Sequence, residues 1–266
     1  MLLKSAYLTK PDQSWIACKS PAPSGLLRLF CFPYAGGSAS MFRAWIKPLS
    51  PVVEVLPVQL PGRGDRINEA AFTDLTPLVE ALVKALAPYL DTPFAFFGHS
   101  MGALISFELA RKLRSDHGPM PVHIIASGRR APQIAQDRMT YNLGDADFEE
   151  ELIRLGGTSN EIVKHPEIME LIRPLLRADF QVCQEYKYTH QPPLPCPLTV
   201  IGGADDPDVR IDHLNAWQEQ TTREFSVSTL PGDHFFIQSA SAAVLQLVAR
   251  DLGRFRRAGP NVLSRG

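Results

Sequence analysis

The sequence predicts an α/β fold in which a mostly parallel central sheet is flanked by helices and interrupted by one helical insertion. Three observations predict it. Short apolar runs alternate with longer helical patterns, as expected for parallel strands joined by helical crossovers. One of these runs ends in a Gly-x-Ser-x-Gly turn at residues 98–102, and a helical pattern follows directly. From Asp145 to Tyr188, helical patterns succeed one another without a strand between them.

The composition favours one cytoplasmic domain spanning residues 1–266 and disfavours several classes of protein. A chain of 266 residues can bury a sizeable core, and its 27 Lys and Arg nearly balance its 28 Asp and Glu. No basic run stands out, so we expect no nucleic-acid partner. Neither a secretion signal nor an apolar run of about 18 residues occurs, so we expect a soluble cytosolic protein without membrane contact. The oligomeric state is open, and a monomer is the default expectation. The four cysteines fit neither a zinc site nor a disulfide framework, so we expect free thiols and no metal.

The elements follow from the apolar patterns in chain order. Residues 1–24 are weakly patterned and are expected to form a loose leader, with a short edge strand near residues 15–18. Short apolar runs predict buried strands, and apolar residues at i, i+3 and i+4 predict amphipathic helices. The expected strands are 26–32, 52–58, 94–97, 122–127, 198–201 and 225–230. The expected helices outside the insertion are 41–48, 73–89, 101–113 and 240–255.

The helical insertion is expected over residues 140–188. Its first helix covers 147–155, and two further pieces, 167–173 and 175–186, flank Pro174. An insertion of this kind between two strands is typical of a lid over an active site. A static packing layer is the alternative, and the pattern does not distinguish the two.

The turn at residues 98–102 is the nucleophile elbow of an α/β-hydrolase fold, because it has the strand, tight turn and helix that this motif requires. Gly98 and Gly102 would let strand and helix crowd against the turn, with the Ser100 hydroxyl exposed at its tip. The N–H of Met101 would open the following helix and face an anion there. A Gly-Ser loop arising by chance is disfavoured by these flanks.

The loop after the first strand, residues 33–40, is rich in small residues. In this fold the loop at that place supplies the second backbone donor of the oxyanion hole. We expect the N–H of Ala35 to be that donor, with Tyr34 as the next choice. The alternative is a Gly-Gly turn without chemistry.

The chain order Ser, Asp, His that accompanies the elbow points to Ser100, Asp206 and His234 as a catalytic triad. A histidine can take the serine proton and return one to the leaving group, and a buried carboxylate fixes the imidazole tautomer. His234 is chosen because it stands in the loop after the last strand. Asp205 adjoins Asp206 and remains the alternative acid, since one residue of register decides between them.

The chain resembles the type II thioesterases that accompany modular polyketide and nonribosomal peptide synthetases, and the related medium-chain thioesterases of fatty acid synthesis. Pro-Gly-Arg-Gly-Asp-Arg at residues 61–66 is the discriminating motif, because ordinary esterases share the elbow but not this stretch. The family often has His where Tyr34 stands, a change that a backbone donor tolerates. The other stretches that carry the resemblance are 32–38, 98–102, 155–158, 175–180, 202–207 and 230–236.

The resemblance implies an editing enzyme. Such thioesterases hydrolyse aberrant or stalled acyl groups from the phosphopantetheine arm of a carrier domain. Ser100 would form an acyl-enzyme, and water activated by His234 would then release the acid. Acyl or peptidyl carrier domains are therefore the expected partners, and no diffusible cofactor is needed.

Three alternatives remain open. An acyl-CoA thioesterase or carboxylesterase would use the same triad on another substrate. An acyltransferase would replace water by an alcohol or amine. The third alternative is a non-catalytic binding protein of this fold. It is disfavoured because such a protein would not need to retain Ser100, Asp206 and His234 together.

Overall fold

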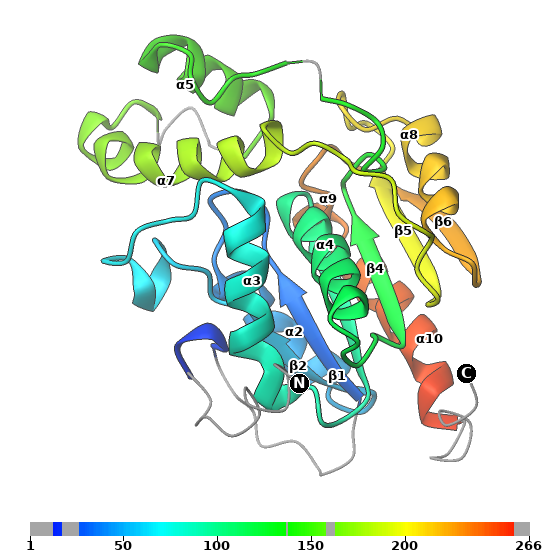
Figure 1. The fold of residues 1–266 in the computed structure, drawn as a ribbon. Coiled ribbons are helices and arrows are strands. Elements are labelled where there is room, and N and C mark those ends of the chain that lie inside the picture. The colour runs from blue at the N-terminus through cyan, green and yellow to red at the C-terminus, as the bar shows by residue number, and fades with distance from the viewer. Residues whose placement is uncertain (1–12, 18–26, 137, 158–162, 258–266) are drawn as a thin grey trace.

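Six parallel strands form the central sheet of the computed structural model (Figure 1). The structure describes residues 13–17, 27–136, 138–157 and 163–257. The order across the sheet is β2-β1-β3-β4-β5-β6, so β3 lies between β1 and β4. This confirms the mostly parallel sheet that the alternating pattern predicted. The strands are β1 (Leu27–Phe32), β2 (Val53–Pro57), β3 (Phe94–His99), β4 (His123–Ser127), β5 (Leu198–Gly203) and β6 (Phe225–Leu230).

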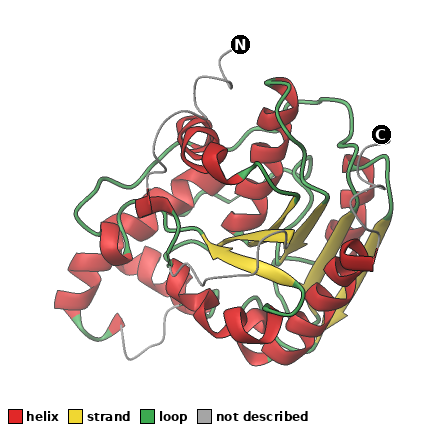
Figure 2. Ribbon diagram, turned by 90° about the horizontal axis from the view of Figure 1, so that it is seen from below, coloured by secondary structure: helices red, strands yellow, loops and turns green. Residues whose placement is uncertain are grey.

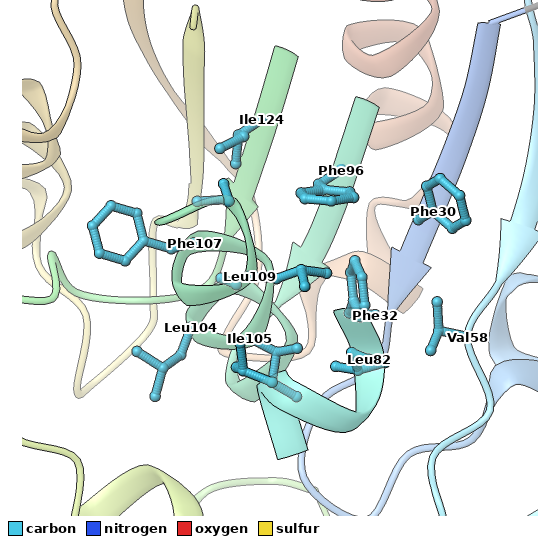
Figure 3. Close-up of a cluster of buried hydrophobic side chains, with 14 of the residues drawn as sticks. Phe30, Phe32, Val58, Leu82, Phe96, Leu104, Ile105, Phe107, Leu109 and Ile124 are labelled. Atoms are coloured by element: carbon cyan, nitrogen blue, oxygen red, sulfur yellow. The ribbon is translucent and has the colours of Figure 1, made fainter. Parts of the chain in front are cut away.

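Helices lie on both sides of the sheet (Figure 2). The main ones are α2 (Arg43–Leu49), α3 (Leu75–Leu86), α4 (Met101–Ser115), α5 (Asp145–Arg154), α7 (Pro166–Gln184), α8 (Ile211–Asn215), α9 (Phe236–Ser239) and α10 (Ser241–Arg257). Side chains of α2 and α10 share one apolar cluster with the sheet, and those of α3 and α4 share another. The alternation of side chains along β1 explains the two clusters, since neighbouring residues of a strand face opposite sides. Phe30 and Phe32 point to α3 and α4 (Figure 3). Leu29 and Cys31 belong to the cluster of α2 and α10 on the other side of the sheet.

The insertion lies between β4 and β5, at the end of the sheet towards which the strands point (Figure 1). Its helices α5 and α7 pack through a small apolar cluster of their own, which includes Phe148, Leu152, Met169 and Leu176. Each helix therefore covers apolar surface of the other. Among the described residues, none of the helices combines the length and the apolar content that a bilayer crossing needs.

The expectation of two helical pieces around Pro174 was wrong, because α7 runs without a break from Pro166 to Gln184. A proline inside a helix removes one backbone hydrogen bond and usually costs about 3 kcal/mol. Here the ring lies on the exposed side of the helix, while Leu176, Ala178 and Asp179 on other sides are buried. Packing of the buried sides keeps the helix continuous.

The expected leader lies mostly outside the described residues. Gln13–Trp15 form a single 3-10 turn, and Ile16 makes an isolated antiparallel bridge to Val58 beside the sheet. The described part of this segment is therefore in contact with the body, with Trp15 only 6% exposed.

Candidate active site

Ser100 occupies a strained turn between β3 and α4. Its φ of 53° and ψ of −111° lie in a region that costs a non-glycine residue energy and is found mostly at functional sites. The flanking glycines make the turn possible. A Cβ on Gly98 would lie 2.0 Å from the carbonyl oxygen of Gly102, and one on Gly102 would lie 2.1 Å from that of Phe32. The strand, the turn and the helix are thus packed against each other without room for a side chain.

The structure brings Ser100, His234 and Asp206 into one hydrogen-bonded chain. His234 Nε2 lies 2.9 Å from Ser100 Oγ, and its Nδ1 lies 2.7 Å from Asp206 Oδ2. The Asp206 side chain has no exposed surface. Because Nδ1–H is donated to the carboxylate, Nε2 is free to accept the serine proton. This geometry can activate Ser100 as a nucleophile.

Asp205 does not reach this chain. Its Oδ2 accepts the N–H of Gly232 at 3.3 Å, which ties the loop after β5 to the loop after β6. Oδ1 of Asp206, by contrast, accepts the N–H groups of Asp208 at 2.9 Å and Val209 at 3.1 Å. The structure therefore aims Asp206 at the imidazole and leaves Asp205 as its structural neighbour.

His99, which precedes Ser100, supports the same loop. Its Nε2–H donates to the backbone carbonyl of His234 at 2.9 Å, and its Nδ1 accepts the hydroxyl of Ser127 at 2.8 Å. Complete burial holds the pKa of His99 well below its usual value, and the nearby His234 lowers it further. His99 is accordingly a neutral imidazole with one fixed tautomer.

The two expected oxyanion donors come from different elements. Ala35, in the loop after β1, lines the same cavity as Ser100. Met101 is the first residue of α4, where N–H groups have no partner within the helix. Within the part of the chain that the structure describes, the N–H groups of Ala35 and Met101 donate to no backbone acceptor. Both are thus available to hold a developing negative charge.

A cavity of about 120 Å³ opens beside Ser100 and His234. The insertion supplies its apolar wall, which consists of Leu152, Leu155, Leu176 and Phe180. Arg129 from the loop after β4 lines the same cavity, and its Nη2 lies 3.4 Å from the carbonyl oxygen of Cys183. Burial raises the pKa of the Cys183 thiol, so that side chain stays neutral. The space suits an apolar group bonded to the carbonyl that Ser100 would attack.

Sequence reasoning missed the long-range partner of Arg63. Their closeness in the sequence predicts that Arg63, Asp65 and Arg66 form a local ion network or shape the rim of the site. Arg63 instead binds Asp179 of α7, 116 residues later, through two hydrogen bonds of 2.6 and 2.8 Å. The sequence does show an arginine in a glycine-rich loop and an aspartate on an apolar helix face. No rule of residue spacing, however, predicts that these two side chains form a pair.

Metal ligands were not expected, and within the described ranges no three His, Cys, Asp or Glu side chains lie together as a metal site would require. The expectation that no cofactor takes part remains a prediction.

The fold and the serine elbow define the class of the protein as an α/β-hydrolase. The chain belongs to the thioesterase family, whose model, described as Thioesterase domain, matches residues 27–252. It is therefore a hydrolase of thioester bonds.

Three relatives show the range of the similarity. Gramicidin S biosynthesis protein GrsT of Aneurinibacillus migulanus is 44% identical over 90% of this chain and 93% of its own length. The solved structure of RedJ, a thioesterase from the prodiginine biosynthetic pathway in Streptomyces coelicolor, is 37% identical with a TM-score of 0.81, covering 93% of each chain. That of BorB, the type II thioesterase from the borrelidin biosynthetic cluster, is 34% identical with a TM-score of 0.82, covering 92% of this chain and 99% of BorB. These similarities confirm the resemblance drawn from the sequence motifs.

Proposed function

We propose that this thioesterase removes acyl groups from the phosphopantetheine arm of carrier domains, using Ser100, His234 and Asp206. The observation that carries the proposal is the hydrogen-bonded chain from Asp206 through His234 to Ser100, beside a cavity that the insertion walls. The names of the relatives support the biosynthetic setting, since they belong to gramicidin S, prodiginine and borrelidin production. Acyl or peptidyl carrier domains of a synthase are the partners that follow.

The reaction has two balanced halves. Ser100 Oγ bonds to the thioester carbon while its proton passes to His234 Nε2, and the carbonyl oxygen gains negative charge. The N–H groups of Ala35 and Met101 hold that charge. The carbon–sulfur bond then breaks, the proton goes to the sulfur, and an acyl ester remains on Ser100.

Water completes the cycle. It attacks the ester carbon and gives a proton to His234 Nε2; the bond from that carbon to Ser100 Oγ then breaks as the proton passes to Oγ, which releases the acid. Asp206 stabilises the imidazolium in both halves without itself being protonated. No group other than the chain and water takes part in these steps.

The experiment presents one acyl group in two forms, on a holo carrier domain and on a small N-acetylcysteamine thioester, with Ser100→Ala as the blank. We expect higher kcat/KM for the carrier-bound form and no turnover by the blank. Equal turnover of the small thioester would favour a general acyl thioesterase, and transfer to an added alcohol or amine would favour an acyltransferase. Activity that survives in Ser100→Ala would overturn the mechanism.

A fluorophosphonate reagent separates the enzyme from a non-catalytic binding protein. Such a reagent forms a stable bond with an activated serine, so we expect one labelled peptide containing Ser100. A folded sample that stays unlabelled would contradict the proposal.

A further inference from the structure

The carboxylate of Asp179 joins three segments that are far apart in the sequence. Oδ2 accepts the backbone N–H of Gly36 at 2.7 Å and Nη1 of Arg63 at 2.6 Å, while Oδ1 accepts Nη2 of Arg63 at 2.8 Å. The side chains of Arg63 and Asp179 are 4% and 3% exposed. Charge-assisted bonds of this bidentate kind are strong and fix geometry as well as distance.

Helix α7 also touches the loop after β1 directly. A Cβ on Gly36, whose φ is +76°, would lie 2.5 Å from Leu176 Cδ2. Nη1 of Arg63 lies 3.4 Å from the carbonyl oxygen of Gly37 in the same loop. The loop is therefore held between α7 and Arg63 from two sides.

The residue that this arrangement restrains is Ala35. The bond from Gly36 N–H to Asp179 fixes the plane of the Ala35–Gly36 peptide. The Gly37 N–H donates to the carbonyl oxygen of Tyr34 at 2.9 Å, which orients the preceding peptide, the one that carries the Ala35 N–H. A donor for a developing oxyanion must be held to within about 0.5 Å of its productive position. A displacement of about 1 Å can lower a rate about a hundredfold.

We propose that Asp179 is a positioning residue, which together with Arg63 holds the Ala35 N–H towards the carbonyl oxygen that Ser100 attacks. Helix α7 is then a fixed wall of the oxyanion hole as well as part of the insertion. This inference rests on the proposed function, because it takes Ala35 as an oxyanion donor.

The test measures kcat and KM on a short acyl N-acetylcysteamine thioester, together with the affinity for a trifluoromethyl ketone of the same acyl chain. The ketone adds to Ser100 and places an oxyanion in the hole. Two variants are compared with the wild type: Asp179→Ala, and the double variant Arg63→Gln with Asp179→Asn. The double variant leaves no unpaired buried charge and keeps an oxygen that Gly36 can reach, so it covers the case in which Asp179→Ala fails to fold.

Glu149→Gln is the matched control. Glu149 of α5 pairs with Arg173 of α7, so this change removes an ion pair of α7 that does not touch the loop after β1. Thermal unfolding curves of every variant establish that each protein is folded at the temperature of the kinetic assay.

We expect kcat to fall about thirtyfold to a hundredfold in Asp179→Ala, with KM within about threefold and the ketone affinity falling in parallel with kcat. The double variant should lose less than Asp179→Ala, and the control should stay within about twofold. A folded Asp179→Ala with wild-type kcat, or a loss confined to KM with the ketone affinity unchanged, would overturn the proposal. If Ser100→Ala is inactive in the same assay, such a result would overturn this inference alone. If Ser100→Ala is active, the proposed function fails as well.

Discussion

His99 donates its Nε2–H to the backbone carbonyl oxygen of His234 at 2.9 Å, although 135 residues separate them. His99 is also the residue directly before Ser100, at the end of β3. One strand end therefore leads into Ser100 and supports the loop that carries His234. We therefore expect the distance between Ser100 Oγ and His234 Nε2 to depend on this bond as well as on Asp206.

The first prediction concerns this bond. His99→Leu removes the donor and leaves the carbonyl of His234 and the hydroxyl of Ser127 unpaired, so kcat should fall about tenfold or more. His99→Gln can keep both bonds and should retain most of the activity. Steady-state kinetics and the rate of fluorophosphonate labelling measure the effect. Equal activity in the two variants would show that the bond does not position His234.

The second prediction separates the two neighbouring aspartates. Asp206→Asn should lower kcat about 10³- to 10⁴-fold, because the amide cannot stabilise the imidazolium or fix its tautomer. Asp205→Asn changes a bond to the Gly232 N–H that an amide oxygen can also accept, so kcat should stay within about threefold. The two variants differ by one position in the chain and serve as controls for each other. A larger loss in Asp205→Asn would mean that the acid is assigned incorrectly.

The third prediction concerns acid stability and His123. Burial lowers the pKa of His123 from 6.5 to about 4, partly offset by the charge of Asp251. Its Nε2 forms a hydrogen bond with Thr199 Oγ1 at 2.9 Å, and its buried Nδ1 has no hydrogen-bond partner among the described residues. An added proton would therefore lie on a buried nitrogen without an acceptor.

The direction in which stability changes with pH follows from this lowered pKa of His123. Below pH 6.5 the unfolded chain binds a proton that the folded chain does not, so stability is complete above this pH and falls as the pH drops towards 4. The loss should reach about 3 kcal/mol at most. Urea unfolding at pH 7 and pH 4.5 measures it, and His123→Gln should show a smaller loss than the wild type. An unchanged difference between the two pH values in His123→Gln would assign the acid sensitivity to other groups.

The fourth prediction concerns Pro174 in the middle of α7. Pro174→Ala restores a backbone donor on an exposed side of the helix, so the free energy of unfolding should rise by about 1–2 kcal/mol. Thermal or urea unfolding measures the change, and kcat should stay within about twofold. A loss of stability would mean that the proline is required for the shape of α7.

Local patterns predicted the sheet well, because each buried strand is a short apolar run and each crossover helix has a regular apolar face. Ser100 and His234 could be chosen as candidates for a similar reason, since Ser100 directly follows one strand and His234 lies in the loop after the last strand of a fold whose order of catalytic residues is fixed. Asp206 was harder to select from the sequence. The choice between Asp206 and Asp205 depends on the path of a turn, which residue spacing alone does not determine.

What could not be predicted depends on contacts between distant segments. The continuity of α7 through Pro174 follows from packing against the rest of the insertion and the sheet domain. The bond of Arg63 to Asp179 links a loop after β2 to a helix more than a hundred residues later. No periodicity in the sequence encodes such a pair.

The position of Asp179 on α7 has a consequence for protein engineering. Chimeras that exchange acyl-chain specificity would be made by grafting the insertion of one thioesterase onto another. A crossover point within the first half of α7 leaves Leu176 and Asp179 with the recipient's own Gly36 and Arg63. Grafts that instead import the whole helix bring a foreign contact to the recipient's loop after β1, and they should include the donor's loops around Gly36 and Arg63.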